Sequence, residues 1–225
     1  IEKKGNVFHV TTDSGKHTSY AVIVATGAKH KKLGIKGEDE FSGRGVSYCA
    51  TCDGPFFKNK KILVVGGGDA ACDEATYLSK LTDKVVMIHR KDRFRAQKSL
   101  AERVEKNKNI EIRFNTECRE IKGSAKVEKV VLETTDGKKY EEDFDAVFIF
   151  IGSLPQTQVI PDVTKDEAGF VIADCNMETS TKGLFVAGDI RDTPFRQIIV
   201  ACGDGAIAAH SAALLIDELQ GNVYI

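Results

Sequence analysis

The fold of this 225-residue chain is decided by the stretch Lys61-Ile62-Leu63-Val64-Val65-Gly66-Gly67-Gly68-Asp69-Ala70-Ala71. A short apolar strand runs directly into the pattern Gly66-x-Gly68-x-x-Ala71, and residues 72–80 continue as a helix. In such a unit Gly66 allows the tight turn, Gly68 lets the backbone approach a pyrophosphate, and Ala71 lets helix and strand pack closely. Strand, glycine turn and helix in this order predict an α/β, Rossmann-like fold that binds a dinucleotide. A tight turn without a ligand is the alternative.

A basic cluster follows the next strand, residues 84–88, and bears on which dinucleotide is bound. A unit that binds NAD carries an acid here, about 20 residues past the glycines, to hold the ribose 2′-hydroxyl. This chain instead has Arg90 and Lys91, with Arg95 close by. Their charge suits a 2′-phosphate, so the sequence favours NADPH over NADH. A solvated basic helix start is the alternative.

Upstream of the glycine turn lie two cysteines, in the segment Tyr48-Cys49-Ala50-Thr51-Cys52-Asp53-Gly54-Pro55. Spacing alone fits a redox dithiol, part of a structural zinc site, or two buried cysteines. A zinc site usually needs a second close pair of ligands, which the other four cysteines, at 72, 118, 175 and 202, do not supply. Because Asp53 follows at once and a dinucleotide turn is near, we favour redox chemistry without a metal. The candidate catalytic residues are Cys49, Cys52 and Asp53.

Composition limits the class of protein. The chain is longer than one average domain, and 42% hydrophobic residues suffice for a globular core. A net charge of −1 gives no case for nucleic acid or an anionic membrane, and we see no apolar run that approaches a span of roughly 20 residues. Few, scattered cysteines favour a reducing, cytoplasmic setting. The sequence starts at Ile1 without a leader pattern and opens inside a strand pattern, so we expect a piece of a longer protein.

The remaining elements frame two candidate domain boundaries. We expect strands at residues 6–12 and 18–25, the second buried on both faces and ending in Thr26-Gly27-Ala28. Residues 29–45 lack periodicity and form one boundary, and Gly152-Ser153-Leu154-Pro155 forms the other. Asp189, at the end of a later strand, could hold a ligand hydroxyl or cap a helix. The patterns further predict a helix at 96–107, strands at 110–114, 127–134, 138–142, 145–150, 169–172 and 184–187, and a long helix at about 199–219.

Along essentially the whole chain, these motifs resemble the low-molecular-weight thioredoxin reductases. Members of that family are homodimeric flavoproteins in which an NADPH domain is inserted into an FAD domain. The resemblance implies that residues 1–33 and 152–225 are a partial FAD-binding domain, and that residues 34–151 are the NADPH-binding domain with the dithiol. The family's opening βαβ unit, which holds FAD, is expected to lie outside this sequence. The motifs that carry the resemblance are Ser47-Tyr48-Cys49-Ala50-Thr51-Cys52-Asp53-Gly54, Gly66-Gly67-Gly68-Asp69-Ala70-Ala71, His89-Arg90-Lys91 with Arg95, and Gly188-Asp189 with Arg196-Gln197.

The resemblance also implies which residues contact each cofactor. The implied NADPH contacts are Gly66, Gly68, Asp69, Ala70, Ala71, His89, Arg90, Lys91, Arg95, Ile151 and Gly152. The implied FAD contacts are Thr26, Gly27, Ala28, Gly188, Asp189, Arg196, Gln197 and Ile198. The chain departs from the family at Lys91, where a second arginine is frequent. Lysine keeps the charge and loses the bidentate fork.

By the same resemblance, electrons pass from NADPH through FAD to the Cys49–Cys52 disulfide and on to thioredoxin. Cys52 would lie toward the flavin, Cys49 would attack the substrate disulfide, and Asp53 would move the protons. Hinges near residues 30–36 and 151–155 would let the NADPH domain rotate. Two alternatives stay open: a related flavoprotein with another donor or acceptor, and a non-catalytic nucleotide-binding fragment.

Overall fold

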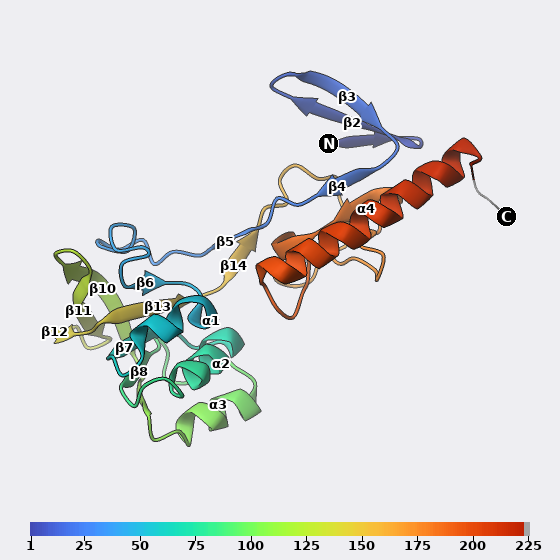
Figure 1. Cartoon of the computed structure of the whole chain (residues 1–225). Coiled ribbons are helices and arrows are strands. Elements are labelled where there is room, and N and C mark those ends of the chain that lie inside the picture. The colour runs from blue at the N-terminus through green and yellow to red at the C-terminus, as the bar shows by residue number, and fades with distance from the viewer. Residues whose placement is uncertain (223–225) are drawn as a thin grey trace. The chain divides into compact units, whose positions relative to one another are not determined.

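The structure, a computed structural model, describes residues 1–222 and divides into two compact units. Unit 2 is the continuous stretch His30–Gly152, and unit 1 consists of Ile1–Lys29 and the chain from Ser153 onward (Figure 1). The sequence placed the boundaries at 33/34 and 151/152. The chain passes from one unit to the other in two short strands that pair with each other, β5 (Ala28–His30) and β14 (Ser153–Pro155).

Unit 2 is built on a five-stranded parallel sheet with the strand order β6-β13-β7-β8-β9. The strands β7 and β8 are buried over their whole length, as expected for a parallel sheet that is covered on both faces. This confirms the α/β fold that the glycine-turn pattern predicts. The strands are β6 (Val46–Ser47), β7 (Ile62–Gly66), β8 (Val85–Ile88), β9 (Ile110–Arg113) and β13 (Ala146–Phe150).

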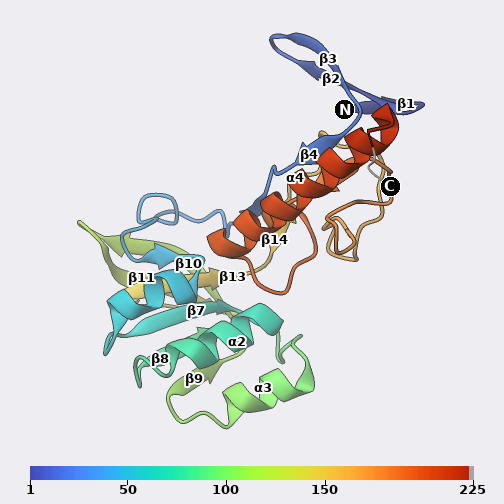
Figure 2. The same cartoon turned by 45° about the vertical axis from the view of Figure 1, so that its right-hand side comes forward.

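The two faces of this sheet are packed by different elements. On one face, α2 (Asp69–Leu78) and α3 (Lys98–Glu105) cover residues such as Ile62, Val64 and Phe148 (Figure 2). The alternate residues of the same strands enter a second core, which a three-stranded antiparallel sheet completes. The strands of that sheet are β10 (Thr116–Gly123), β11 (Val127–Thr134) and β12 (Lys139–Asp143). Two short helical turns precede β7, α1 (Ala50–Asp53) and η1 (Gly54–Phe57).

Unit 1 combines an antiparallel meander with a small parallel pair. The meander consists of β1 (Glu2–Lys4), β2 (Val7–Thr12) and β3 (Gly15–Ser19). The parallel pair consists of β4 (Val22–Val24) and β15 (Leu184–Val186), and Phe8, Val24 and Val186 share its core. The turn η2 (Gly188–Ile190) follows β15, and the long helix α4 (Ile198–Gln220) packs against β15 and β4. The helix ends at Gly221 in the left-handed conformation that commonly stops a helix.

Three sequence-based expectations for single strands were wrong. The strand expected at 18–25 is two elements, the end of β3 and the short β4. Its expected burial on both faces fails at Tyr20 and Ile23, which are 46% and 40% exposed, because within residues 1–222 β4 pairs only with β15. The strand expected at 169–172 is absent from the described chain, where Val171 makes only isolated bridges. An apolar run satisfies the strand pattern, but a strand forms only where a partner backbone lies alongside.

The helix α4 corrects the expectation that no segment resembles a membrane span. It is long and apolar enough to cross a membrane by length and composition, and only 22% of its most apolar window is buried. We missed it because alanines and glycines, and Asp204 within it, interrupt any simple run of large apolar residues. Asp204 is 5% exposed and pairs with Arg191, so it adds little polar surface to the helix. Length and composition alone are weak evidence for a membrane span, because a core helix also satisfies them.

Replacing Gly37 tests the loop that precedes the dithiol. A Cβ atom on Gly37 would lie 2.0 Å from the carbonyl oxygen of Ile121, and its φ is +88°. We expect Gly37→Ala to lower the free energy of unfolding by about 3 kcal/mol, since overpacking adds to backbone strain. Gly43 also has a positive φ, +71°, but its Cβ would meet open space within the described chain. Gly43→Ala should therefore cost only about 1 kcal/mol. Denaturant unfolding measures both values. Equal losses of unfolding free energy in the two variants would show that the contact with Ile121 does not matter.

Candidate redox and dinucleotide sites

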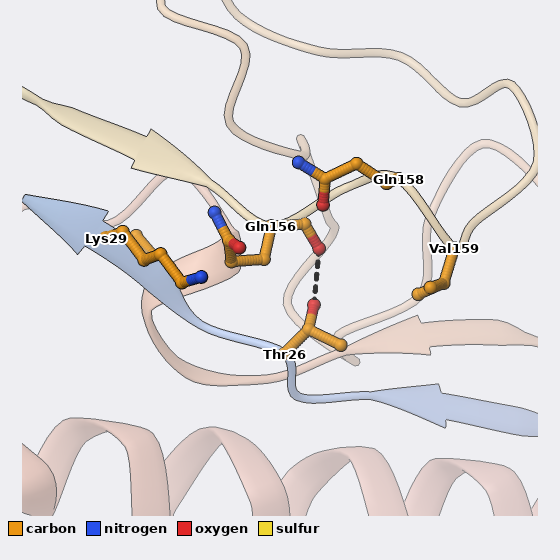
Figure 3. A pocket seen from close by; sticks show the side chains of 6 residues that line it. Thr26, Lys29, Gln156, Gln158 and Val159 are labelled. Atoms are coloured by element: carbon orange, nitrogen blue, oxygen red, sulfur yellow. Dashed lines mark hydrogen bonds between the residues drawn. The ribbon is translucent and has the colours of Figure 1, made fainter.

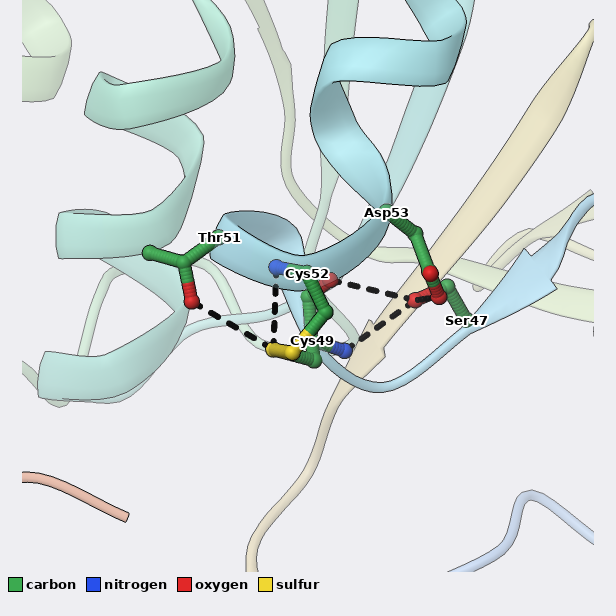
Figure 4. Close-up of a disulfide and its surroundings, with 5 residues drawn as sticks. All are labelled: Ser47, Cys49, Thr51, Cys52 and Asp53. Atoms are coloured by element: carbon green, nitrogen blue, oxygen red, sulfur yellow. Dashed lines mark hydrogen bonds between the residues drawn. A yellow bond between two sulfur atoms is a disulfide. The ribbon is translucent and has the colours of Figure 1, made fainter. Parts of the chain in front are cut away.

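The two cysteines of the dithiol segment are bonded to each other. Cys49 and Cys52 form a disulfide with a Cα–Cα distance of 5.3 Å (Figure 4). Cys49 is the N-cap of α1, and the backbone N–H of Cys52 donates to its Sγ at 3.2 Å. A donor held in this place stabilises a thiolate when the disulfide is reduced. Cys52 is exposed and Cys49 is half-buried.

A serine that our sequence reasoning did not single out organises the acid beside the disulfide. Ser47, the last residue of β6, is 5% exposed, and its hydroxyl donates to Oδ2 of Asp53 at 2.6 Å (Figure 4). The same hydroxyl accepts the backbone N–H of Cys49 at 3.1 Å. The structure thus holds Asp53 and Cys49 through one buried side chain. The only sequence signal for this role was the serine's place directly before the Tyr48-Cys49 pair.

The glycine turn after β7 is shaped by close packing. A Cβ atom on Gly66 would lie 2.4 Å from the carbonyl oxygen of Phe150 and 2.6 Å from Cβ of Ala71. One on Gly67 would overlap the ring of His89 at 2.4 Å. At Gly68, by contrast, no atom in the described chain lies within 4 Å of an added Cβ. The backbone at Gly68, the N-cap of α2, is therefore open to an approaching group, as a pyrophosphate-binding turn requires.

The loop after β8 is fastened to the start of α2. The carboxylate of Asp69 accepts the backbone N–H of Gln97 at 2.7 Å and its side-chain amide at 3.2 Å. The backbone N–H of Arg95 donates to the carbonyl oxygen of Gly67 at 2.7 Å. We predicted that Asp69 contacts the cofactor. In the structure its carboxylate binds Gln97 of this loop. Sequence reasoning missed Gln97, because nothing in the sequence shows that it lies across from Asp69.

The basic residues after β8 lie around a partly buried histidine, His89. Burial lowers the pKa of His89, and the charges of Arg90, Arg95 and Lys91 lower it further. Its Nε2 atom is buried and finds no hydrogen-bond partner among residues 1–222. The three cations themselves are exposed. The structure therefore brings these four residues together beside the glycine turn, since the ring of His89 packs on Gly67.

The last two residues implied for the NADPH site follow β13. In the sheet register Phe150 is paired with Gly66, so Ile151 and Gly152 leave the sheet beside the glycine turn. The carbonyl oxygen of Gly152 accepts the backbone N–H of Lys31 at 2.9 Å. The site residues of unit 2 thus come from the carboxyl ends of three neighbouring strands, β13, β7 and β8, where ligands bind in open α/β sheets.

The candidate residues of unit 1 also lie at strand ends. Thr26, Gly27 and Ala28 follow β4, and Gly188 and Asp189 follow its parallel neighbour β15. The Thr26 hydroxyl donates to the carbonyl oxygen of Gln156 at 2.6 Å. A hollow of about 430 Å³ opens there, with the side chains of Lys29 and Gln158 beside it (Figure 3). Its lining consists of Thr26, Ala28, Lys29, Gln156, Gln158 and Val159.

A buried ion pair fixes the turn that carries Asp189. The carboxylate of Asp204 in α4 accepts the backbone N–H of Gly188 at 3.1 Å and two guanidinium N–H groups of Arg191 at 2.7 and 3.0 Å. These bonds lower the pKa of Asp204 although its burial acts in the opposite direction. No sequence signal marks this pair, because the two residues lie 13 positions apart and only the fold brings them together.

The remaining candidates precede α4. The guanidinium of Arg196 lies over the ring of Phe170, 4.1 Å from its centroid. Its Nε atom is buried and has no hydrogen-bond partner in the described part of the chain. Gln197 is the N-cap of α4, and Ile198 begins the helix with 85% of its surface exposed.

Fold and sites together define a class: a dinucleotide-binding α/β protein that carries a redox disulfide in the same unit as its glycine turn. Residues 1–205 match the pyridine nucleotide-disulphide oxidoreductase family. The thioredoxin reductase of Treponema pallidum is 55% identical over 221 residues, which is 98% of this chain and 72% of that relative. That of Listeria monocytogenes is 44% identical and covers 94% of this chain and 67% of the relative.

Solved structures give the same result. The thioredoxin reductase of Streptococcus pyogenes is 41% identical, with a TM-score of 0.90 over 97% of this chain and 72% of that structure. The thioredoxin reductase of Giardia duodenalis is 38% identical, with a TM-score of 0.87 over 92% of this chain and 70% of that structure. The chain therefore belongs to the pyridine nucleotide-disulphide oxidoreductase family, and within it to the thioredoxin reductases.

The four cysteines outside the disulfide differ in their environment, and alkylation can test this. Burial raises the pKa of the Cys72 thiol to about 11 and that of Cys118 to about 12, so both stay protonated at pH 8. Cys175 and Cys202 are exposed. We expect iodoacetamide at pH 8 to label only Cys175 and Cys202 in the oxidised native protein, and also Cys49 and Cys52 after mild reduction. Peptide mass spectrometry measures this, and rapid labelling of Cys72 or Cys118 would contradict the described burial.

Proposed function

We propose that this protein is an NADPH-dependent thioredoxin-disulfide reductase, in which electrons pass through FAD to the Cys49–Cys52 disulfide and on to thioredoxin. The observation that carries the proposal is the position of that disulfide. It lies in the unit whose glycine turn, open at Gly68, suits a dinucleotide. The names of its relatives support thioredoxin as the substrate.

The residues present fit both cofactors. The unpartnered Nε2 of His89 and the open backbone at Gly68 suit the adenosine and pyrophosphate parts of NADPH, with Arg90, Lys91 and Arg95 toward the 2′-phosphate. The buried Nε of Arg196 has no partner within residues 1–222 and is a donor available to FAD. The other residues we assign to FAD are Thr26, Gly27, Ala28, Gly188, Asp189, Gln197 and Ile198. Bound FAD would supply the two-electron redox chemistry that links NADPH to the Cys49–Cys52 disulfide.

The residues of this chain then carry the electrons to the substrate. Two electrons and two protons convert the Cys49–Cys52 disulfide into a dithiol. The Cys49 thiolate attacks one sulfur of the thioredoxin disulfide, which forms a mixed disulfide and releases a thioredoxin thiolate that is then protonated. Cys52 next attacks Cys49 of the mixed disulfide, so the second thioredoxin thiol leaves and the Cys49–Cys52 bond forms again. Asp53, held by Ser47, is the group we assign to moving protons.

The surface beside the disulfide supports a protein substrate. Phe56 in η1, four residues after Cys52, is 80% exposed, and Lys58 and Lys60 next to it are exposed as well. An exposed aromatic side chain with a charged rim is typical of a protein contact site. We further propose a homodimer, for which exposed Ile199 and Leu214 of α4 provide apolar surface, and a cytoplasmic location, which suits four free thiols.

Removing one sulfur tests the proposal directly. With FAD and NADPH present, we expect Cys52→Ser to lose thioredoxin reduction by at least about 1000-fold, because the mixed disulfide cannot be resolved and the disulfide cannot form. Reduction of a dye that accepts electrons from the flavin should persist, since that route bypasses the cysteines. Spectrophotometric assays with thioredoxin and with the dye measure both. A wild-type protein that reduces the dye but not thioredoxin would refute the assigned substrate.

Neutralising the basic cluster tests the choice of NADPH. Arg90→Ala with Lys91→Ala should raise KM for NADPH by about 10- to 100-fold, because charge-assisted bonds to a 2′-phosphate are lost. KM for NADH should change little, since NADH has no such phosphate. Arg93→Ala is the matched control, as it removes an exposed cation of the same loop that is outside the assigned set. Equal changes in KM for NADPH and for NADH would exclude a 2′-phosphate site at these residues.

A further inference from the structure

A buried carboxylate lies in the loop that leads to the dithiol. Glu38 is only 1% exposed, while its neighbours Asp39 and Glu40 are exposed. Burying a carboxylate is costly unless hydrogen bonds replace its water. The position of Glu38, ten residues before Tyr48, gave no sequence signal for such burial.

Three donors from two separate segments satisfy this carboxylate. The backbone N–H groups of Leu33 and Gly34 donate to it at 3.0 and 2.8 Å. The Tyr48 hydroxyl donates to Oε1 at 2.8 Å. Burial raises the pKa of the Tyr48 phenol, and the bond to Glu38 raises it further, so the phenol keeps its proton at working pH. Glu38 thus joins the start of unit 2 to the residue before Cys49 through charge-assisted bonds.

The ring of Tyr48 is also held. It stacks on the ring of His30, the first residue of unit 2, with centroids 5.1 Å apart and planes within 9°. A second contact holds the same segment, because the Ser47 hydroxyl accepts the Cys49 backbone N–H. The peptide that carries Cys49 is therefore fixed both through Tyr48 and through Ser47.

We propose that Glu38 and Tyr48 are a positioning pair for Cys49, an inference that rests on the proposed function. The bonds of the two side chains run to each other and to the backbone N–H groups of Leu33 and Gly34. Thiol–disulfide exchange requires the attacking sulfur to be in line with the bond it breaks, so small displacements slow the reaction strongly. The pair fixes the Cys49 backbone in the place where Sγ meets the Cys52 N–H. Loosening it should therefore impair the steps at sulfur and spare the steps before them.

The first test is Tyr48→Phe, which removes the hydroxyl and keeps the ring. In the FAD-loaded protein we expect kcat for thioredoxin to fall about tenfold, while dye reduction and KM for NADPH stay within about twofold. Tyr140→Phe is the matched control, because Tyr140 packs, partly buried, against the same hydrophobic core as Tyr48. It should leave all three quantities unchanged. If thioredoxin turnover in Tyr48→Phe equals wild type, or falls together with dye reduction, the positioning role is excluded.

A second variant, Glu38→Gln, removes the charge and keeps only one of the two oxygens that accept the Leu33 and Gly34 N–H groups, and its NH2 group faces the other donor. It should lower thioredoxin turnover in the same selective way, and the double variant should lose less than the product of the two single effects. If the loss of thioredoxin turnover in the double variant equals the product of the two single losses, the two residues do not act as a pair.

A flavin-independent readout separates this inference from the proposed function. In the reduced protein we expect iodoacetamide to label Cys49 about threefold more slowly in Tyr48→Phe than in wild type, because the thiolate is less well held by the Cys52 N–H. If wild type fails to reduce thioredoxin and the labelling still slows, the proposed function is wrong and the positioning pair stands. If the labelling rate is unchanged, the positioning pair fails whatever the substrate.

Discussion

Unit 2 depends on one steric constraint, the contact between the turn after β7 and the end of β13. Gly66 lies where any side chain would meet the Phe150 carbonyl oxygen and the methyl group of Ala71. Because these three groups meet without a Cβ between them, α2 can start directly over the sheet edge. Its N-terminus and the open backbone of Gly68 then face the carboxyl ends of the parallel strands. The same close approach places His89 on Gly67 and so brings the basic loop to the turn.

The dithiol is organised by a different kind of interaction, a small network of buried polar groups. Ser47 and Glu38 are both almost fully buried. Ser47 bonds to the Cys49 N–H and to Asp53, and Glu38 bonds to the hydroxyl of Tyr48. In a low-dielectric environment such bonds are strong, and leaving one unmade is costly. The redox segment is therefore rigid where it leaves β6, while Cys52 remains exposed to a partner.

The sequence predicted the elements whose signal is local. The strand–turn–helix unit, the strand 127–134 and the long final helix were found because residue type and period suffice to define them. Residues joined across long separations could not be predicted from local patterns: Gln97 with Asp69, Asp204 with Arg191, and Glu38 with Tyr48. The strand β10 was missed because its mixed, charged sequence contains a bulge that breaks the alternation. The cofactor contacts themselves remain predictions, supported by where the strand ends place these residues.

The course of the chain has a consequence for how such proteins arise. Unit 2 is entered at His30 and left at Gly152, and its two ends are joined by the bond between Lys31 and Gly152. A module whose entry and exit points adjoin can be transplanted into a surface loop of an unrelated host without stretching either structure. Unit 2, which carries the disulfide, could therefore be exchanged as a whole, in evolution or by protein engineering, while unit 1 keeps its fold.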